Sequence, residues 1–142
     1  MKEPSDKRKR TLALHDRATR FSTNVNACCP RHHTTLPSSR VWDQLVRAAD
    51  STSNNLIEAD GASSESDFLS KMCIALREAK EARLALMKIR IGQLDGCREV
   101  AELEVESEAS QLSAIFATII LNMRLRVERE RREAEARIRR KQ

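Results

Sequence analysis

The sequence predicts an all-α protein, and its composition and periodicity lead to that fold class. With only 3 Gly, 3 Pro, no Tyr and 3% aromatic residues, the chain lacks the turn residues and strand formers of an all-β protein. The strong helix formers Ala, Leu, Arg, Glu and Lys are abundant. At 142 residues the chain is long enough for one domain with a modest core. We therefore expect one domain over residues 1–142, an up-down antiparallel four-helix bundle whose fourth helix is extended at its C-terminus.

The first helix is expected from about Arg10, after a flexible basic N-terminus at residues 1–9. Prolines 30 and 37 cannot continue a helix interior, so the segment between them is expected to be a loop. The apolar residues of this helix form one stripe with spacings of four and three: Leu14, Ala18, Phe21, Val25 and Cys28.

The second helix is expected to begin at Ser38 or Ser39, either of which can cap it by accepting a hydrogen bond from a free backbone N–H. Gly61 is expected to end it. In its second half, polar side chains occupy positions of the face expected to be buried, and buried polar side chains need hydrogen-bond partners. Ser51, Asn55 and Glu58 are therefore predicted to form a structural polar junction.

The third helix has the most regular periodicity and is expected to be capped by Ser63 or Ser64. Three alanines in the middle of its stripe predict close contact with another helix. The stripe residues are Phe68, Met72, Ala75, Ala79, Ala82, Leu86 and Ile89.

The fourth helix is expected after a turn bracketed by Gly92 and Gly96, with glutamates in its first turns. Between residues 115 and 121 the helix is apolar nearly all round, which one packed face does not require. This pattern predicts a second buried face against another subunit. The predicted oligomer interface consists of Ile115, Phe116, Ile119 and Ile120.

The formal charge of +5 is unevenly distributed. Residues 1–10 carry a net charge of +3 and residues 124–142 carry +5, which leaves −3 for residues 11–123. Any contact with a polyanion should therefore involve the termini. The candidate nucleic-acid-binding residues are Arg124, Arg126, Arg129, Arg131, Arg132, Arg137, Arg139, Arg140 and Lys141.

The same basic segment also fits a solvated helix held by ion pairs between side chains four residues apart. Glu128–Arg132, Glu133–Arg137 and Glu135–Arg139 have the favourable order for such pairs. Base-specific readout is not expected, because no known DNA-binding motif surrounds the arginines and aromatic residues are scarce.

No metal site, cofactor or catalytic residue is predicted. Cys28-Cys29 and His32-His33 lie close in sequence, but adjacent cysteines cannot easily share one tetrahedron with adjacent histidines. No histidine follows a glutamate with the Glu-x-x-His spacing of di-iron bundles. Asn55 and Glu58 have no His, Lys or metal-ligand partner in sequence, so no small-molecule substrate is expected.

Two runs of residues carry a family resemblance. Residues 44–61, QLVRAADSTSNNLIEADG, contain Arg-Ala-Ala, then Ser51, then Asn-Leu-Ile-Glu ending at Glu58, then Gly61, and residues 67–83 read DFLSKMCIALREAKEAR. They resemble helices 2 and 3 of the four-helix bundle proteins related to those encoded in 23S rRNA intervening sequences. The chain departs from that pattern at Ala59, where the family commonly has glycine, and at residues 84–86, Leu-Ala-Leu, where it often has an aromatic pair.

The resemblance implies a homopentamer without established enzymatic activity. A related branch accompanies reverse transcriptases in diversity-generating retroelements and binds nucleic acid through a basic surface; for this chain that role is an analogy. The first hypothesis is thus a non-enzymatic oligomeric bundle with weak, sequence-independent binding of RNA or DNA. The alternative is a structural or protein-interaction module without a nucleic-acid partner.

The sequence also suggests where the protein resides. The N-terminal residues MKEPSDKRKR are not followed by an apolar segment, so no secretory signal is expected. The run from Leu112 to Met123 is too short for a membrane span. Because the four cysteines include no C-x-x-C pair, reduced thiols in the cytoplasm are the expectation.

Overall fold

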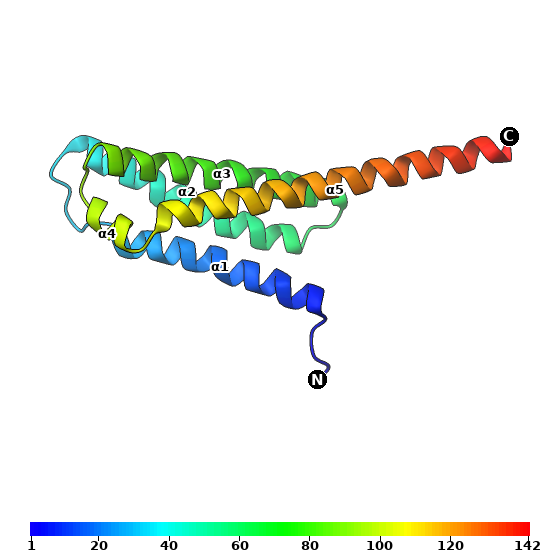
Figure 1. Cartoon of the computed structure of the whole chain (residues 1–142), viewed down its shortest axis with the longest axis horizontal. Coiled ribbons are helices and arrows are strands. Elements are labelled where there is room, and N and C mark those ends of the chain that lie inside the picture. The colour runs from blue at the N-terminus through cyan, green and yellow to red at the C-terminus, as the bar shows by residue number, and fades with distance from the viewer.

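The protein is built from five helices and contains no strand (Figure 1). The computed structural model describes residues 1–142. Four long helices pack side by side as a helical bundle, and a short one lies near the loops at one end. The predicted all-α class is confirmed. None of the helices combines the length and apolar character that crossing a membrane requires. The helices are α1 (Asp6–Cys28), α2 (Leu36–Asp60), α3 (Glu65–Ile91), α4 (Cys97–Glu102) and α5 (Val105–Lys141).

α1 begins at Asp6, ahead of the expected start near Arg10. The Ser5 side chain caps it by accepting a hydrogen bond from the backbone N–H of Arg8. Residues 6–9 are polar and exposed, so the apolar stripe gave no sign that they were helical. Only the C-terminal half of α1 is buried, through Ala18, Phe21, Ser22, Val25 and Cys28.

α2 begins at Leu36, and its cap is Thr35 instead of Ser38 or Ser39. Pro37 thus lies inside the helix, in the first turn, where a proline is tolerated because the backbone N–H it lacks would have no helical partner. Ser38 is buried in the helix, only 1% exposed. The prediction that Pro37 precedes the helix was wrong for this reason.

α3 begins after Ser64, whose side chain accepts a hydrogen bond from the N–H of Asp67, as predicted. Ala75, Ala79 and Ala82 are fully buried. α3 packs against α2 more extensively than any other two helices pack, because small side chains allow close approach. The close contact expected at these alanines is confirmed.

The expected fourth helix is two helices, α4 and α5. Between them Glu104 adopts a left-handed conformation, with φ of 53°. Val100 and Val105 are both buried, yet residues five positions apart point to different sides of a continuous helix. The break at Leu103 and Glu104 lets both valines enter one core.

The two ends of the bundle hold different segments. At one end the α1–α2 loop meets the α3–α4 turn, where Trp42 Nε1–H donates to the carbonyl of Asp95 at 2.6 Å. At the other end α1 begins and the α2–α3 loop lies. There Arg8 pairs with Asp60 of α2, and Arg126 of α5 pairs with Glu65 of α3 at 2.9 Å. α5 leaves the bundle at this second end (Figure 1).

Candidate nucleic-acid interface

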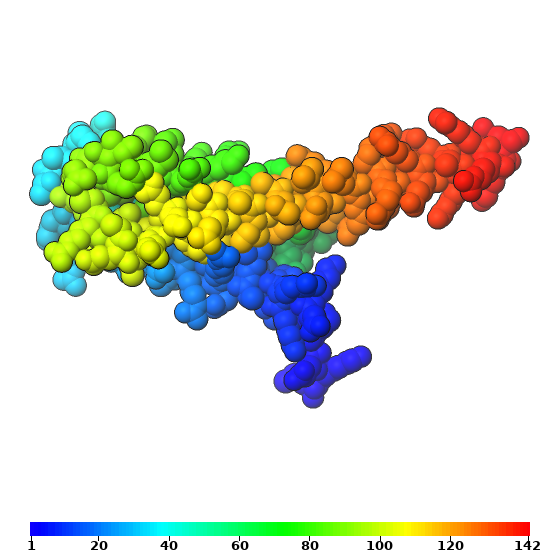
Figure 2. Space-filling view, in the orientation of Figure 1, coloured from blue at the N-terminus to red at the C-terminus, as the bar shows by residue number.

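The C-terminal part of α5 projects away from the rest of the molecule, as Figures 1 and 2 show. From Arg129 to Gln142 every side chain is exposed. Residues 124–142 contain no glycine or proline and consist mostly of Arg, Glu and Ala, so from Arg129 onward local helix propensity and side-chain pairs maintain the helix without tertiary contacts. We call residues 124–142 the extension. Residues 124–141 span about 26 Å.

The ion pairs of the extension differ from those expected. Of the three predicted pairs, only Glu128–Arg132 forms, at 3.0 Å, while Glu133–Arg137 and Glu135–Arg139 are absent. Arg131 bridges Glu128 and Glu135, at 2.9 and 3.1 Å. Ion pairs between side chains of the helix therefore occur only in the first two-thirds of the extension.

Ion pairs neutralise three of the five arginines in residues 124–135. The guanidinium groups of Arg131 and Arg132 hydrogen-bond to Glu128 and hold the pKa of that carboxyl below its usual range. The same contact raises the pKa of Arg131. Arg126 is likewise bonded to Glu65 and lies 3.7 Å from Glu130. A phosphate would have to compete with carboxylates for these three arginines.

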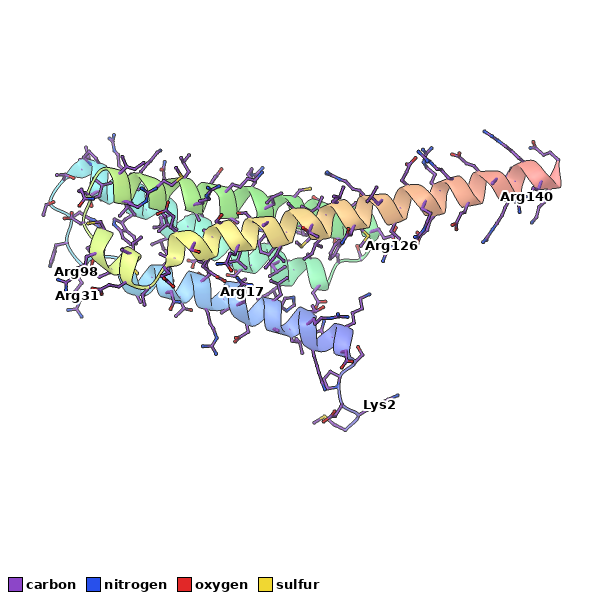
Figure 3. All side chains as sticks on the ribbon, in the orientation of Figure 1. Lys2, Arg17, Arg31, Arg98, Arg126 and Arg140 are labelled. Carbon is purple, nitrogen blue, oxygen red and sulfur yellow. The ribbon has the colours of Figure 1, made fainter.

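The positive charge is concentrated at the far end. Residues 124–135 hold five basic and four acidic side chains, whereas residues 136–142, which we call the tip, hold four basic and no acidic ones. The tip cations Arg137, Arg139, Arg140 and Lys141 form no ion pair, and neither do Arg124 and Arg129. Figure 3 shows Arg140 pointing into solvent, far from the bundle.

The N-terminal basic segment lies at the same end of the bundle as the extension (Figure 3). Arg8 is paired with Asp60 and Lys9 with Glu3. Three cations of this segment form no ion pair: Lys2, Lys7 and Arg10. Folding thus brings both basic segments to one end of the bundle, while the mildly acidic residues 11–123 make up the bundle itself. The sequence showed two basic termini but not that they share an end.

The predicted oligomer-interface residues lie mostly inside the single chain. Phe116 is fully buried and Ile120 is 4% exposed, both in the core, while Ile115 and Ile119 are half-buried at its edge. Phe116 and Ile120 are therefore unavailable to a second subunit. The outward side of α5 is still uncharged between Glu108 and Arg124, where it exposes Ala114, Ala117, Thr118 and Leu121. Leu125, one residue beyond Arg124, is exposed as well.

The predicted polar junction divides into two separate contacts. The Asn55 side-chain amide donates to the backbone carbonyl and the hydroxyl of Ser51, at 2.9 and 3.0 Å, within α2. Glu58 pairs with Lys71 of α3 at 3.2 Å. Ser51, Asn55 and Glu58 all line a shallow groove on the surface of α2.

A cluster that the sequence did not reveal joins the loops at the opposite end. Asp95 accepts hydrogen bonds from the N–H and hydroxyl of Thr34, and His33 Nδ1 lies 3.1 Å from the Ser38 hydroxyl. The Thr34 N–H, chiefly, lowers the pKa of Asp95, and a hydrogen bond from Ser38 adds to this. Since Ser38 is buried, the group ties two loops together and offers no accessible nucleophile.

The histidines and cysteines do not form a cluster of metal-ligating side chains. Nowhere do three or more His, Cys, Asp or Glu side chains come together in a way that could hold a metal ion. Cys28 is buried and Cys29 half-buried, and both are free thiols. Burial raises the pKa of each thiol.

Comparison with known proteins supports the fold alone. No protein-family model matches the sequence, and no curated protein does. A similar solved structure is the 1.70 Å crystal structure of a protein of unknown function from the S23 ribosomal protein family of Bacteroides thetaiotaomicron. It superimposes with a TM-score of 0.60 at 21% sequence identity, covering 75% of this chain and 97% of that one. The chain thus resembles this S23-family protein in its fold.

Proposed function

We propose that this chain is a non-enzymatic, cytoplasmic subunit of a homo-oligomer that binds RNA or DNA weakly and without sequence specificity. Within this proposal the four long helices form an up-down antiparallel bundle and the assembly is a pentamer, as the resemblance of residues 44–83 to intervening-sequence proteins implies. The bundle acts as the scaffold, and the extension of α5 contacts the nucleic acid.

The proposal rests on the exposure of the tip cations and on their lack of ion pairs. The four tip cations are exposed and form no ion pair, so each can contact a phosphate without first breaking one. The N-terminal cations at the same end of the bundle add to the positive potential. The paired arginines Arg126, Arg131 and Arg132 act mainly as part of the spacer.

Charge-matched variants test this proposal. Changing the four tip cations to Gln should weaken binding of a mixed-sequence oligonucleotide at least about tenfold at low salt and lower the slope of log K against log salt by about three. Fluorescence anisotropy at several salt concentrations measures both quantities. The control removes four exposed, unpaired cations from the body: Arg31, Arg40, Arg83 and Lys88.

The control loses as much charge as the tip variant but should bind within about threefold of the unchanged protein at about 0.15 M salt, because net charge alone acts weakly once salt screens it. Equal losses in both variants would show that only net charge matters. Unchanged binding by the tip variant would exclude the tip as the contact.

The second candidate is a structural or protein-interaction module with no polyanion partner. It is favoured by the ion-paired proximal extension, where Glu128 and Glu135 hold Arg131. Under this alternative the extension is a solvated helix, and no oligonucleotide binds measurably even at low salt.

A further inference from the structure

A cleft lies between α1 and α5, at the end of the bundle that holds both basic segments. Its volume is about 590 Å³, within the range of small-ligand sites. It exists because the N-terminal half of α1 is not packed down on α5, so the apolar stripes of several helices stay partly uncovered at this end. Its apolar lining includes Leu14, Leu56, Phe68, Met72, Ile119 and Met123.

Cations from two helices flank this apolar floor. Lys7 of α1 has no carboxylate within ion-pair distance. Arg126 of α5 also lines the cleft, but its guanidinium is paired with Glu65 at 2.9 Å. The one carboxylate at the cleft, Asp60, is neutralised by Arg8. Lys7 is therefore the one unpaired cation that lines the cleft, and it favours an anionic group in the occupant.

The rim also carries polar groups that are free to bind. The His15 ring and the Asn122 amide line the cleft and make no side-chain hydrogen bond within the chain. An alkyl chain offers such groups no hydrogen bond, whereas the edge of a heterocycle would bond to them. The extension of a second copy would bring a net charge of +5 to cations already present, which disfavours it.

We infer that the cleft receives an unpaired nucleotide of a single-stranded nucleic acid, with the base against Phe68 and Leu14 and the phosphate at Lys7. This inference rests on the proposed function and specifies the form of nucleic acid. In a duplex the bases are stacked and paired, so only the backbone contacts of the tip are available to it. The protein should accordingly prefer single strands to duplexes, without reading the sequence.

The test compares a short single-stranded oligonucleotide carrying a 2-aminopurine base with its blunt duplex, using the full-length protein. The unchanged protein should bind the single strand about tenfold more tightly, the effect expected for one base in an apolar site. The 2-aminopurine fluorescence should change on binding the single strand and stay constant on binding the duplex.

Two matched variants locate the effect. Leu14→Glu places a carboxylate in the cleft and should remove both the single-strand preference and the fluorescence change. Leu12→Glu makes the same charge change on α1 at an exposed residue that does not line the cleft, and should leave both intact. Asn122→Ala, at an exposed residue, repeats the test if Leu14→Glu unfolds the protein, and should weaken the preference several-fold.

The outcomes separate this inference from the proposed function. If the unchanged protein binds both oligonucleotides with equal affinity and the tip variant binds neither, the inference about the cleft is wrong but the proposed function stands. Absence of binding to either oligonucleotide refutes both. If laurate suppresses the fluorescence change and a nucleoside monophosphate does not, the cleft is an amphiphile site and the inference is wrong.

Discussion

Gly96 occupies the most constrained backbone position in the molecule. Its φ of +82° lies in the left-handed region that favours glycine, and a Cβ there would stand 2.6 Å from Cζ2 of Trp42. The same Trp42 donates its indole N–H to the neighbouring carbonyl of Asp95. A side chain at residue 96 would therefore disturb the junction between α2 and the α3–α4 turn.

We predict that Gly96→Ala lowers the free energy of unfolding by roughly 2–4 kcal/mol, from left-handed strain plus overpacking. Urea unfolding followed by the fluorescence of Trp42, the single tryptophan, measures the change. Gly61→Ala is the control, because its φ is −93° and the nearest atom to an added Cβ is 3.7 Å away. That variant should stay within about 1 kcal/mol of the unchanged protein. A similar loss in both variants would argue against a special role for residue 96.

Asp95 gives the same junction a pH dependence. Hydrogen bonds from the Thr34 N–H, and then from Ser38 and the Thr34 hydroxyl, hold its pKa below that of an ordinary aspartate. A carboxyl with a lowered folded-state pKa stabilises the protein above the unfolded-state pKa, and that contribution disappears as pH falls through the folded value.

We therefore predict that Asp95→Asn is less stable than the unchanged protein at neutral pH, and that the difference shrinks as the pH falls below about 4. Urea midpoints at neutral and acidic pH measure it. Asp43→Asn removes an exposed carboxylate that makes no ion pair or hydrogen bond, so it should not change the pH profile. A constant difference between Asp95→Asn and the unchanged protein at all pH values would contradict the role of Asp95.

At the scale of the helices, features set by the local sequence were predicted correctly, whereas features set by tertiary packing were not. Ser64, Gly61 and the alanine stripe of α3 act through neighbours in sequence or along one face, and each was predicted correctly. The start of α2 was predicted incorrectly, because Thr35, Ser38 and Ser39 can each cap a helix through a side-chain hydroxyl. Only the burial of Ser38 beneath the α1–α2 loop decides among them.

The division between α4 and α5 also depends on tertiary structure. No glycine or proline marks Leu103 and Glu104, and glutamate is an adequate helix former. The left-handed Glu104 is maintained because it brings Val100 and Val105 into the same core. The basic tip, in contrast, could have been predicted from the sequence. A count of charges in short windows of the extension separates residues 136–142 from the residues before them, where acidic and basic side chains alternate.

At the scale of the whole molecule, the question is how many copies act together. Under the proposed function a ring would gather several extensions, and weak phosphate contacts at each tip would combine into a stronger multivalent one. We propose the exposed, uncharged side of α5 as the surface for contacts between copies, in place of the buried Phe116 and Ile120. Leu121 and Leu125 are 56% and 59% exposed on it.

We predict that light scattering on the purified protein gives five times the chain mass of 16.2 kDa. Leu121→Glu should reduce the mass to that of the single chain, because a buried carboxylate without a partner is costly in an interface. Leu84→Glu, at a residue on α3 that is 52% exposed, should leave the assembly unchanged. A single-chain mass for the unchanged protein would refute the oligomer.

The sequence by itself determined the helical class, the regions that become the long helices and the basic character of both termini, because helix propensity, apolar periodicity and charge are properties of neighbouring residues. Tertiary structure alone decided which of those features meet. It buried Phe116 and Ile120, joined Asp95 to Thr34, and opened the cleft beside Leu14. It also brought the N-terminal cations to the end from which the extension projects. These outcomes depend on the packing of helices far apart in the chain, which short-range patterns do not record.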